Sequence, residues 1–266
     1  LLLFLWAIQA MLSDAACAGQ SQFLPLEVRD GLPSRQVMSL AQDHEGYIWI
    51  GTQDGLARYD GGKFLIYRHT PGDNRSLPGN YVQAVHVDPG NRIWVAIEGH
   101  GLLLMDAAHS GFSPLPLGKD ASTADVWAIA SNGDGSVWFG TFGNGLFRLL
   151  PDGRLRHYLP TPGMPGLPDE NVLSLAFDAT GTLWIATTSG IVKWRKESFM
   201  AFDNARLSSP VVINLMPDRE LGMWLGTRGG LNLVDNSGNV QTPAWASALT
   251  NNRIMAVLQD DDGSRI

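Results

Sequence analysis

Residues 43–52, DHEGYIWIGT, decide the fold because the chain repeats them. Close copies are centred on four further tryptophans: Trp94, Trp138, Trp184 and Trp224. Successive tryptophans, counted from Trp49, are 45, 44, 46 and 40 residues apart. A repeat of this length is typical of propellers and helical arrays, in which each unit packs on its neighbours.

Each copy carries the same residue types at fixed distances from its Trp. Six positions before it stands Asp or Asn: Asp43, Asp88, Asn132, Asp178 and Asp218. Val stands twelve positions before it, and Gly or Ala two positions after it. We expect the Asp or Asn to form a tight turn by accepting hydrogen bonds from backbone amides. The Trp ring then fills the space between neighbouring sheets, and the small residue lets the next sheet approach.

Four short strand-like runs make up each copy. In the first they span residues 37–42, 48–52, 56–60 and 64–69, and Gly-containing turns separate them. No segment has the i, i+3, i+4, i+7 apolar pattern that a pair of helices requires. Four strands in each unit predict an all-β protein, a β-propeller of four-stranded blades.

The copies predict about five and a half blades in this chain. The predicted boundaries are residues 32–70, 77–117, 121–159, 167–202 and 207–243, a partial blade at 249–266, and an N-terminal outer strand at 22–29. In a closed propeller such an N-terminal strand completes the last blade and removes an open sheet edge. We therefore expect further blades after residue 266.

The first eighteen residues predict a partial signal peptide. Residues 1–12, LLLFLWAIQAML, are almost wholly apolar but too few to span a bilayer. Ala16-Cys17-Ala18 is typical of a cleavage site. Cys17 is the only cysteine, so cleavage after Ala18 leaves no thiol in the remaining propeller region, 19–266. These features predict a periplasmic protein.

Composition and motifs exclude several function classes. The formal net charge is -7 and Lys and Arg do not cluster, which argues against nucleic acid as a partner. The six histidines are scattered, and no metal-ligand or nucleophile motif appears. We predict no catalytic residue, no metal and no cofactor.

The pattern W-I-G-T-x-x-G-L-x-R-Y-D, preceded by D-x-x-G, resembles the two-component regulator propeller repeat. The resemblance covers residues 23–266, although Ala96-Ile97 and Ala186-Thr187 replace Gly-Thr in two copies. It implies a seven-bladed extracytoplasmic sensor domain of a bacterial signalling protein. It also implies a following β-sandwich, a membrane helix and a histidine kinase or diguanylate cyclase output module. A homodimer of the full-length protein is a further expectation.

Two other function classes share this fold. A propeller scaffold for protein binding uses the same surface as a sensor, so the sequence separates them poorly. A periplasmic glycosidase or lyase is the other alternative, because carboxylates brought together in space leave no local motif.

Recognition is predicted where the repeats differ from one another. The turn between the second and third strands and the residues before the first strand share one face of the propeller and carry varied polar and aromatic side chains. The predicted ligand-binding residues are Glu98, His100, Phe142, Asn144, Arg228, Arg35, Tyr81 and Asn171. The predicted ligand is a polar small molecule or an oligosaccharide, and the predicted protein partners are downstream domains of the same polypeptide.

Overall fold

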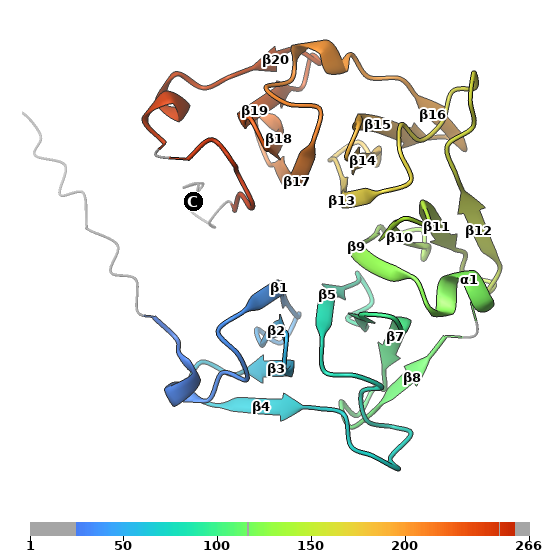
Figure 1. Cartoon of the computed structure of the whole chain (residues 1–266), viewed down its shortest axis with the longest axis vertical. Coiled ribbons are helices and arrows are strands. Elements are labelled where there is room, and N and C mark those ends of the chain that lie inside the picture. The colour runs from blue at the N-terminus through green and yellow to red at the C-terminus, as the bar shows by residue number, and fades with distance from the viewer. Residues whose placement is uncertain (1–24, 116, 250, 259–266) are drawn as a thin grey trace, which may run out of the picture.

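The computed structural model describes residues 25–115, 117–249 and 251–258. In this part the strands form five four-stranded antiparallel sheets, and each sheet is a meander of consecutive strands. The sheets stand around a common centre with their first strands innermost (Figure 1), and each first strand contacts the first strand of the next blade. The predicted β-propeller of four-stranded blades is confirmed.

The blades keep the order of the sequence. The first is β1 (Val37–Gln42), β2 (Ile48–Thr52), β3 (Gly55–Tyr59) and β4 (Phe64–Tyr67); the second is β5 (Val82–Val87), β6 (Ile93–Ile97), β7 (Gly101–Met105) and β8 (Phe112–Pro114). The third is β9 (Asp125–Ser131), β10 (Val137–Phe142), β11 (Leu146–Leu149) and β12 (Leu155–Tyr158). The fourth is β13 (Val172–Phe177), β14 (Leu183–Thr187), β15 (Gly190–Arg195) and β16 (Ser198–Met200), and the fifth is β17 (Val212–Asp218), β18 (Gly222–Thr227), β19 (Gly230–Asp235) and β20 (Val240–Gln241). Short helical turns lie at η1 (Val28–Asp30), α1 (Lys119–Ser122), η2 (Asn204–Arg206) and η3 (Ala244–Ala248).

The predicted N-terminal outer strand is wrong for the part that is described. Residues 25–27 have no regular structure, and Val28 begins the 3-10 turn η1. An outer strand needs an open sheet edge to pair with, and each of the five described sheets already has its own fourth strand. Residues 22–24 and the predicted signal peptide lie outside the described residues.

The described part of the predicted sixth blade also contains no strand. Residues 251–258 nevertheless lie against the fifth blade: the backbone N–H of Ile254 donates to the Thr227 carbonyl at 3.0 Å, and that of Val257 donates to Asn214 Oδ1 at 3.1 Å. Ile254 takes the place, relative to Gly226, that Val82 takes relative to Gly51. The segment therefore occupies the position of an innermost strand without the neighbours that a sheet requires.

The repeated Asp joins its turn to the Trp of its blade. Asp43 Oδ1 accepts hydrogen bonds from the backbone N–H groups of Glu45 and Tyr47, each at 3.0 Å, as predicted. Its other oxygen, Oδ2, accepts from Trp49 Nε1 at 2.8 Å, which the sequence did not predict. The same bond forms in three other blades, Asp88–Trp94, Asp178–Trp184 and Asp218–Trp224, at 2.9, 2.9 and 2.8 Å.

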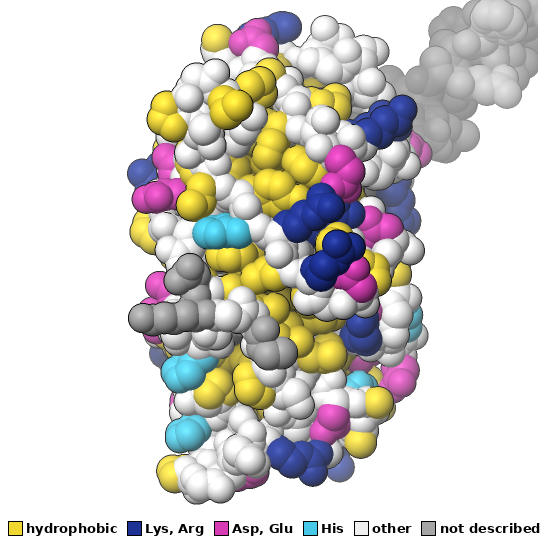
Figure 2. Space-filling model, turned by 90° about the vertical axis from the view of Figure 1, so that its right-hand side faces the viewer, with side chains coloured by type: hydrophobic (Ala, Val, Ile, Leu, Met, Phe, Trp, Pro, Cys, Tyr) yellow, Lys and Arg dark blue, Asp and Glu magenta, His cyan; other side chains and the backbone are white. Residues whose placement is uncertain are grey.

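The third blade holds its Trp differently. Asn132 Oδ1 accepts only from the Asp134 backbone N–H, at 3.2 Å, and among the described residues Trp138 donates no hydrogen bond. The guanidinium of Arg148 lies 4.9 Å from the centre of the Trp138 ring, and cations also lie over the Trp rings of the first, second and fourth blades, so the missing Asp bond is what sets the third blade apart. Arg148 is nearly buried and also bonds Glu197 of the fourth blade, which lowers the pKa of that carboxyl. On this side of the molecule basic side chains lie among acidic ones (Figure 2).

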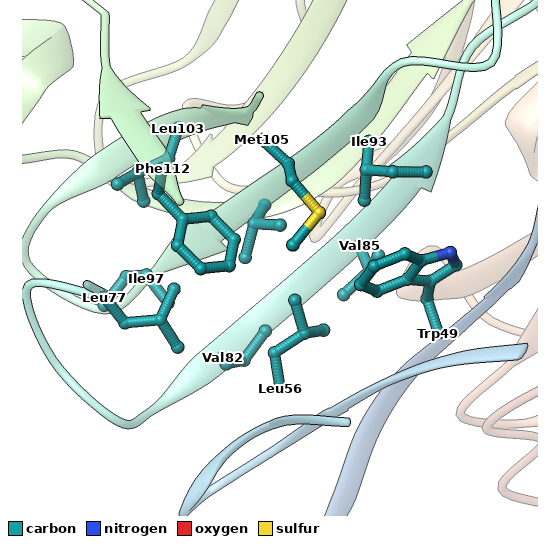
Figure 3. Packing of buried hydrophobic residues seen from close by; sticks show 11 residues of the cluster. Trp49, Leu56, Leu77, Val82, Val85, Ile93, Ile97, Leu103, Met105 and Phe112 are labelled. Atoms are coloured by element: carbon teal, nitrogen blue, oxygen red, sulfur yellow. The ribbon is translucent and has the colours of Figure 1, made fainter. Parts of the chain in front are cut away.

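Neighbouring blades touch at the small residue after each Trp. A Cβ built on Gly51 would lie 2.9 Å from Val82 Cγ1, and one built on Gly140 would lie 2.3 Å from Val172 Cγ1. Figure 3 shows the resulting core between the first two blades, where Trp49 and Leu56 face Val82 and other apolar side chains of the second blade. The predicted roles of the Trp and of the small residue are confirmed.

Replacing Asp43 by Ala is expected to lower the free energy of unfolding by about 2–4 kcal/mol. The change leaves a buried indole N–H and two turn amides without their acceptor, and bonds to charged groups are each worth about 1.5–3 kcal/mol. Asn132→Ala is the matched control, with an expected loss below about 1 kcal/mol, because Trp138 does not bond Asn132. Urea denaturation of both variants measures the difference, and equal losses would contradict the assigned role of the carboxylate.

Replacing Gly140 by Ala is expected to cost about 1–3 kcal/mol, since the new methyl group overlaps Val172 and forces the third and fourth blades apart. Gly133→Ala serves as its control, because a Cβ there meets nothing within 4 Å and its backbone angle is not of the left-handed kind. Thermal unfolding of the two variants compares them; a Gly140→Ala protein as stable as the Gly133→Ala protein would show that the blades are not in close contact at this point.

Candidate functional site

One end of every blade presents the residues that differ between repeats. The start of each innermost strand pairs with the end of the second strand, for example Val37 with Thr52 and Val82 with Ile97. The residues before the first strand and the turn after the second therefore lie at the same end of the sheet. We call the ring of these residues over the five blades the mouth.

The eight predicted ligand-binding residues all lie at the mouth, but the structure distributes them around it. Three lie together on the second blade: the Glu98 backbone N–H donates to the Tyr81 carbonyl at 3.1 Å, and the His100 ring bonds the Glu98 carbonyl at 2.8 Å. Phe142 and Asn144 belong to the third blade. Asn171, Arg228 and Arg35 belong to the fourth, fifth and first blades.

Each innermost strand also carries a β-bulge at the mouth, which the sequence analysis missed. One residue is skipped in the pairing of every first and second strand: Met38, Gln83, Trp127, Leu173 and Ile213. Bulges free a residue from the ladder and redirect its side chain, and they are frequent next to binding sites. The only signal for them in the sequence was the constant position, eleven residues before each Trp.

Two of these bulge residues contact predicted site residues. The Trp127 and Phe142 rings stack with centroids 5.3 Å apart and planes at 26°, and the two side chains are 43% and 49% exposed. In the first blade Met38 Sδ accepts from the Tyr81 hydroxyl at 3.7 Å, and that hydroxyl also bonds Gln53 Nε2 at 3.5 Å. The bulge residue of the first blade, the end of its second strand and the next blade thus meet at Tyr81.

Charges at the mouth are unevenly distributed. Carboxylates lie on the first four blades, at Asp54, Glu98, Asp125, Asp169 and Glu170, whereas Arg228 lies on the fifth and Arg35 on the first. Asp125 Oδ1 accepts from the Gly99 backbone N–H at 3.1 Å, which ties the second and third blades together. Among the described residues no group of three or more His, Cys, Asp and Glu side chains is placed to hold a metal ion.

The opposite end of the propeller contains a cavity that the predicted residues do not line. It has a volume of about 390 Å³, lies between the fourth and fifth blades, and is bordered by the turns that follow β13 and β17 together with Lys193 and Arg195. Lys193 lies 3.7 Å from the centre of the Trp184 ring, and burial lowers the pKa of its ammonium. This cation therefore supports the structural Trp of its blade.

His86 is a titratable group between the innermost strands of the second and third blades. Its Nε2 forms a 2.7 Å hydrogen bond with the Ser131 hydroxyl. Burial lowers the pKa of His86 to about 4, against a smaller opposing effect of Asp88. The imidazole is therefore neutral in the folded protein near pH 7.

A family model described as two component regulator propeller matches residues 31–54 and 166–189. These two segments are similar to two component regulator propeller repeats. A histidine kinase, P4, of Formosa agariphila is 46% identical over 48 residues, a match that covers 18% of this chain and 4% of the kinase. The predicted resemblance is confirmed. The first matched segment, 31–54, contains the bulge residue, the turn after β1 and the Trp of the first blade.

Solved structures share the fold of these propeller repeats. The extracellular domain of a hybrid two component system from B. thetaiotaomicron is 20% identical with a TM-score of 0.55, and the match covers 91% of this chain and 40% of that one. An inactive variant of virginiamycin B lyase from Staphylococcus aureus, solved with quinupristin, is 17% identical with a TM-score of 0.64 over 89% of this chain and 77% of the lyase. At these identities the likeness shows the fold, and the chain spans less than half of the two component domain.

No helix in the described ranges combines the length and the apolar character that crossing a bilayer requires. The propeller resembles the extracellular domains of two component systems in its fold. The fold is shared with a lyase as well, so the fold alone does not decide between a sensor and an enzyme.

Acid is expected to destabilise the protein partly through His86. The folded pKa lies near 4 and the ordinary value is 6.5, so the unfolded chain binds the proton first as pH falls. The contribution of His86 to the free energy of unfolding is complete above about pH 6.5 and is lost as pH falls toward about 4.

His86→Gln keeps a hydrogen-bonding group toward Ser131 but does not titrate. Urea midpoints measured from pH 7.5 to pH 4.5 should fall more steeply for the wild-type protein than for His86→Gln. The acidic side chains are common to both proteins, so their effect cancels in the comparison. Parallel curves would mean that folding does not lower the pKa of His86.

Proposed function

We propose that this chain is the ligand-sensing, periplasmic propeller domain of a bacterial signal-transduction protein whose output module is a histidine kinase or a diguanylate cyclase. The match to two component regulator propeller repeats and the short identity with a histidine kinase support this proposal. So does the resemblance to extracellular domains of two component systems. The signal-like segment at residues 1–18 supports the periplasmic location.

The observation that carries the proposal is the contrast between the constant packing residues of the blades, which we call the frame, and the varied residues of the mouth. Each blade is fixed by the same buried Trp, by the same close approach of a small residue and, in four blades, by the same Asp. At the mouth the corresponding positions hold different side chains, for example Gln53, Glu98, Phe142 and Arg228. A rigid frame that presents varied polar and aromatic groups suits recognition of a polar small molecule or an oligosaccharide.

Sensing would pass from the mouth to downstream domains of the same polypeptide. Adjacent innermost strands are linked by side chains: the Val85 backbone N–H donates to Ser39 Oγ at 3.0 Å, and that of Leu215 donates to Ser174 Oγ at 3.0 Å. Binding energy at one junction would therefore act on a series of innermost strands in which each packs on the next. A homodimer of the full-length protein would bring two output modules together.

The test uses the full-length protein in membranes, with kinase or cyclase activity as the readout and maltotriose, xylotriose and cellotriose as probes. At least one probe is expected to change the activity several-fold, and Glu98→Ala and Arg228→Ala are expected to abolish the change. Arg154→Ala is the control, since this exposed arginine lies at the opposite end, in the turn after β11.

Equal responses in the two mouth variants and in the control would contradict recognition at the mouth. Capture of a protein on the propeller without any change in output would favour a scaffold. Turnover of a probe by the isolated chain would favour an enzyme.

A further inference from the structure

We propose that the exposed Trp127–Phe142 pair is a subsite for a cationic organic group, such as the ammonium of a polyamine or an amino sugar. This inference rests on the proposed sensing role of the mouth and adds the chemistry of one part of the ligand. It is carried by the exposure of the pair, its rigid support and the sign of the charges around it.

The pair is exposed although its blade has both neighbours. Val37 and Leu40 are exposed on the first blade because no described blade precedes them, whereas the corresponding residues of the second blade, Val82 and Val85, are buried. Trp127 and Phe142 lie on the third blade, between the second and fourth, and remain 43% and 49% exposed. Their exposure is therefore not explained by a missing sheet.

The two rings contact one another although both side chains are open to solvent. Trp127 is the bulge residue of β9, and Phe142 is the last residue of β10, opposite Asp125 in the pairing. The rings stack on one another at 5.3 Å, so the outer faces remain open while each ring restrains the other. Aromatic rings fixed in this way bind with little loss of side-chain entropy.

The same two positions in the other blades are not aromatic. They hold Met38 and Gln53 in the first, Gln83 and Glu98 in the second, Leu173 and Thr188 in the fourth, and Ile213 and Arg228 in the fifth. Since the frame folds with all these pairs, blade packing does not require two aromatic rings here. A ligand that stacks on a ring face explains why two aromatic residues stand at these positions.

Three acidic residues lie on the chain segments that adjoin the pair. Asp125 lies opposite Phe142 in the ladder; Glu98 precedes Gly99, whose N–H bonds the Asp125 carboxylate at 3.1 Å; and the Glu170 carbonyl accepts from the Gly145 N–H at 2.8 Å, beside the turn that follows Phe142. None of these three carboxylates forms an ion pair with a described residue. Because ring faces and carboxylates both attract cations, the two features favour the same occupant.

A neutral sugar would use the ring faces but not the charge. Cation–π contacts are worth about 0.5–2 kcal/mol, and nearby carboxylates add an attraction that salt screens over about 10 Å at 0.1 M. Charge and salt dependence therefore distinguish a cationic ligand from a neutral ligand that stacks on the same rings.

The experiment is calorimetric titration of the intact protein with spermidine, glucosamine and N-acetylglucosamine at 50 and 500 mM NaCl. We expect glucosamine to bind at least tenfold more tightly than its neutral N-acetyl form. Spermidine is expected to bind as well, and raising the salt should weaken both cations.

Variants then assign the binding to this pair. Trp127→Ala and Phe142→Ala are expected to weaken spermidine binding about tenfold, and Trp127→Phe to restore most of it. Asp125→Asn and Glu98→Gln keep the shape but should reduce the affinity and its salt dependence. Arg154→Ala changes an exposed residue at the opposite end of the propeller and should leave binding unchanged.

Equal affinity for glucosamine and its neutral form, no binding of either cation at 10 mM, or full binding by the two aromatic variants would overturn the proposal. If the cations fail while a neutral trisaccharide still changes kinase or cyclase activity, this subsite is wrong and the sensing function stands. If neither cations nor saccharides act on the full-length protein, the sensing function fails as well.

Discussion

The contact between the small residue of one blade and the aliphatic side chain of the next is the constraint on which the structure depends. At Gly140 a single methyl group would overlap the Val172 side chain, so the two sheets leave no room for a larger residue at this point. That distance lets a Trp ring close the space between sheets, and burial of such a ring is worth roughly 5 kcal/mol before entropy. The Asp fixes the ring by accepting a hydrogen bond from the indole N–H, and it fixes the turn by accepting bonds from two backbone amides. Blade spacing, ring position and turn shape are thus set together.

The sequence predicted the frame well because the frame is repeated. Five aligned copies separate the constant Trp, Val and Gly or Ala from the variable residues, and constant spacing converts directly into blade geometry. The bond from Asp43 Oδ2 to Trp49 Nε1 was not predicted, although its constant six-residue spacing was visible, because a turn alone accounted for the Asp. The substitution of Asn132 for Asp was treated as equivalent, yet Asn132 does not accept a hydrogen bond from the Trp138 indole N–H as Asp does in the other four blades. The N-terminal strand was wrong because strand formation depends on a partner sheet as well as on local pattern.

The mouth was predicted only in part. Loop position identified Phe142 and Tyr81, since turns that share a sheet end must lie together, and both have ring or hydroxyl contacts there. Trp127 and Met38 were missed because they lie inside strands, where an alternating pattern assigns side chains to one face or the other. A bulge breaks that alternation, and the local residue types do not predict it. Topology predicts where the eight residues lie, because it fixes which turns share a sheet end. It does not predict which ligand their side chains bind.

The bulges at the start of each innermost strand allow the side chains of the mouth to change without changes in the packing of the blades. A side chain that is skipped in the ladder contributes little to pairing, and the five bulge residues of this chain range from Gln83 to Trp127 without altering the registers on either side. Substitutions there can accumulate independently in each blade, and distant blades should respond additively. A single ancestral blade, duplicated several times, could therefore diverge into a surface with several distinct contacts while its packing stayed the same. Specificity in such a protein is adjusted one blade at a time.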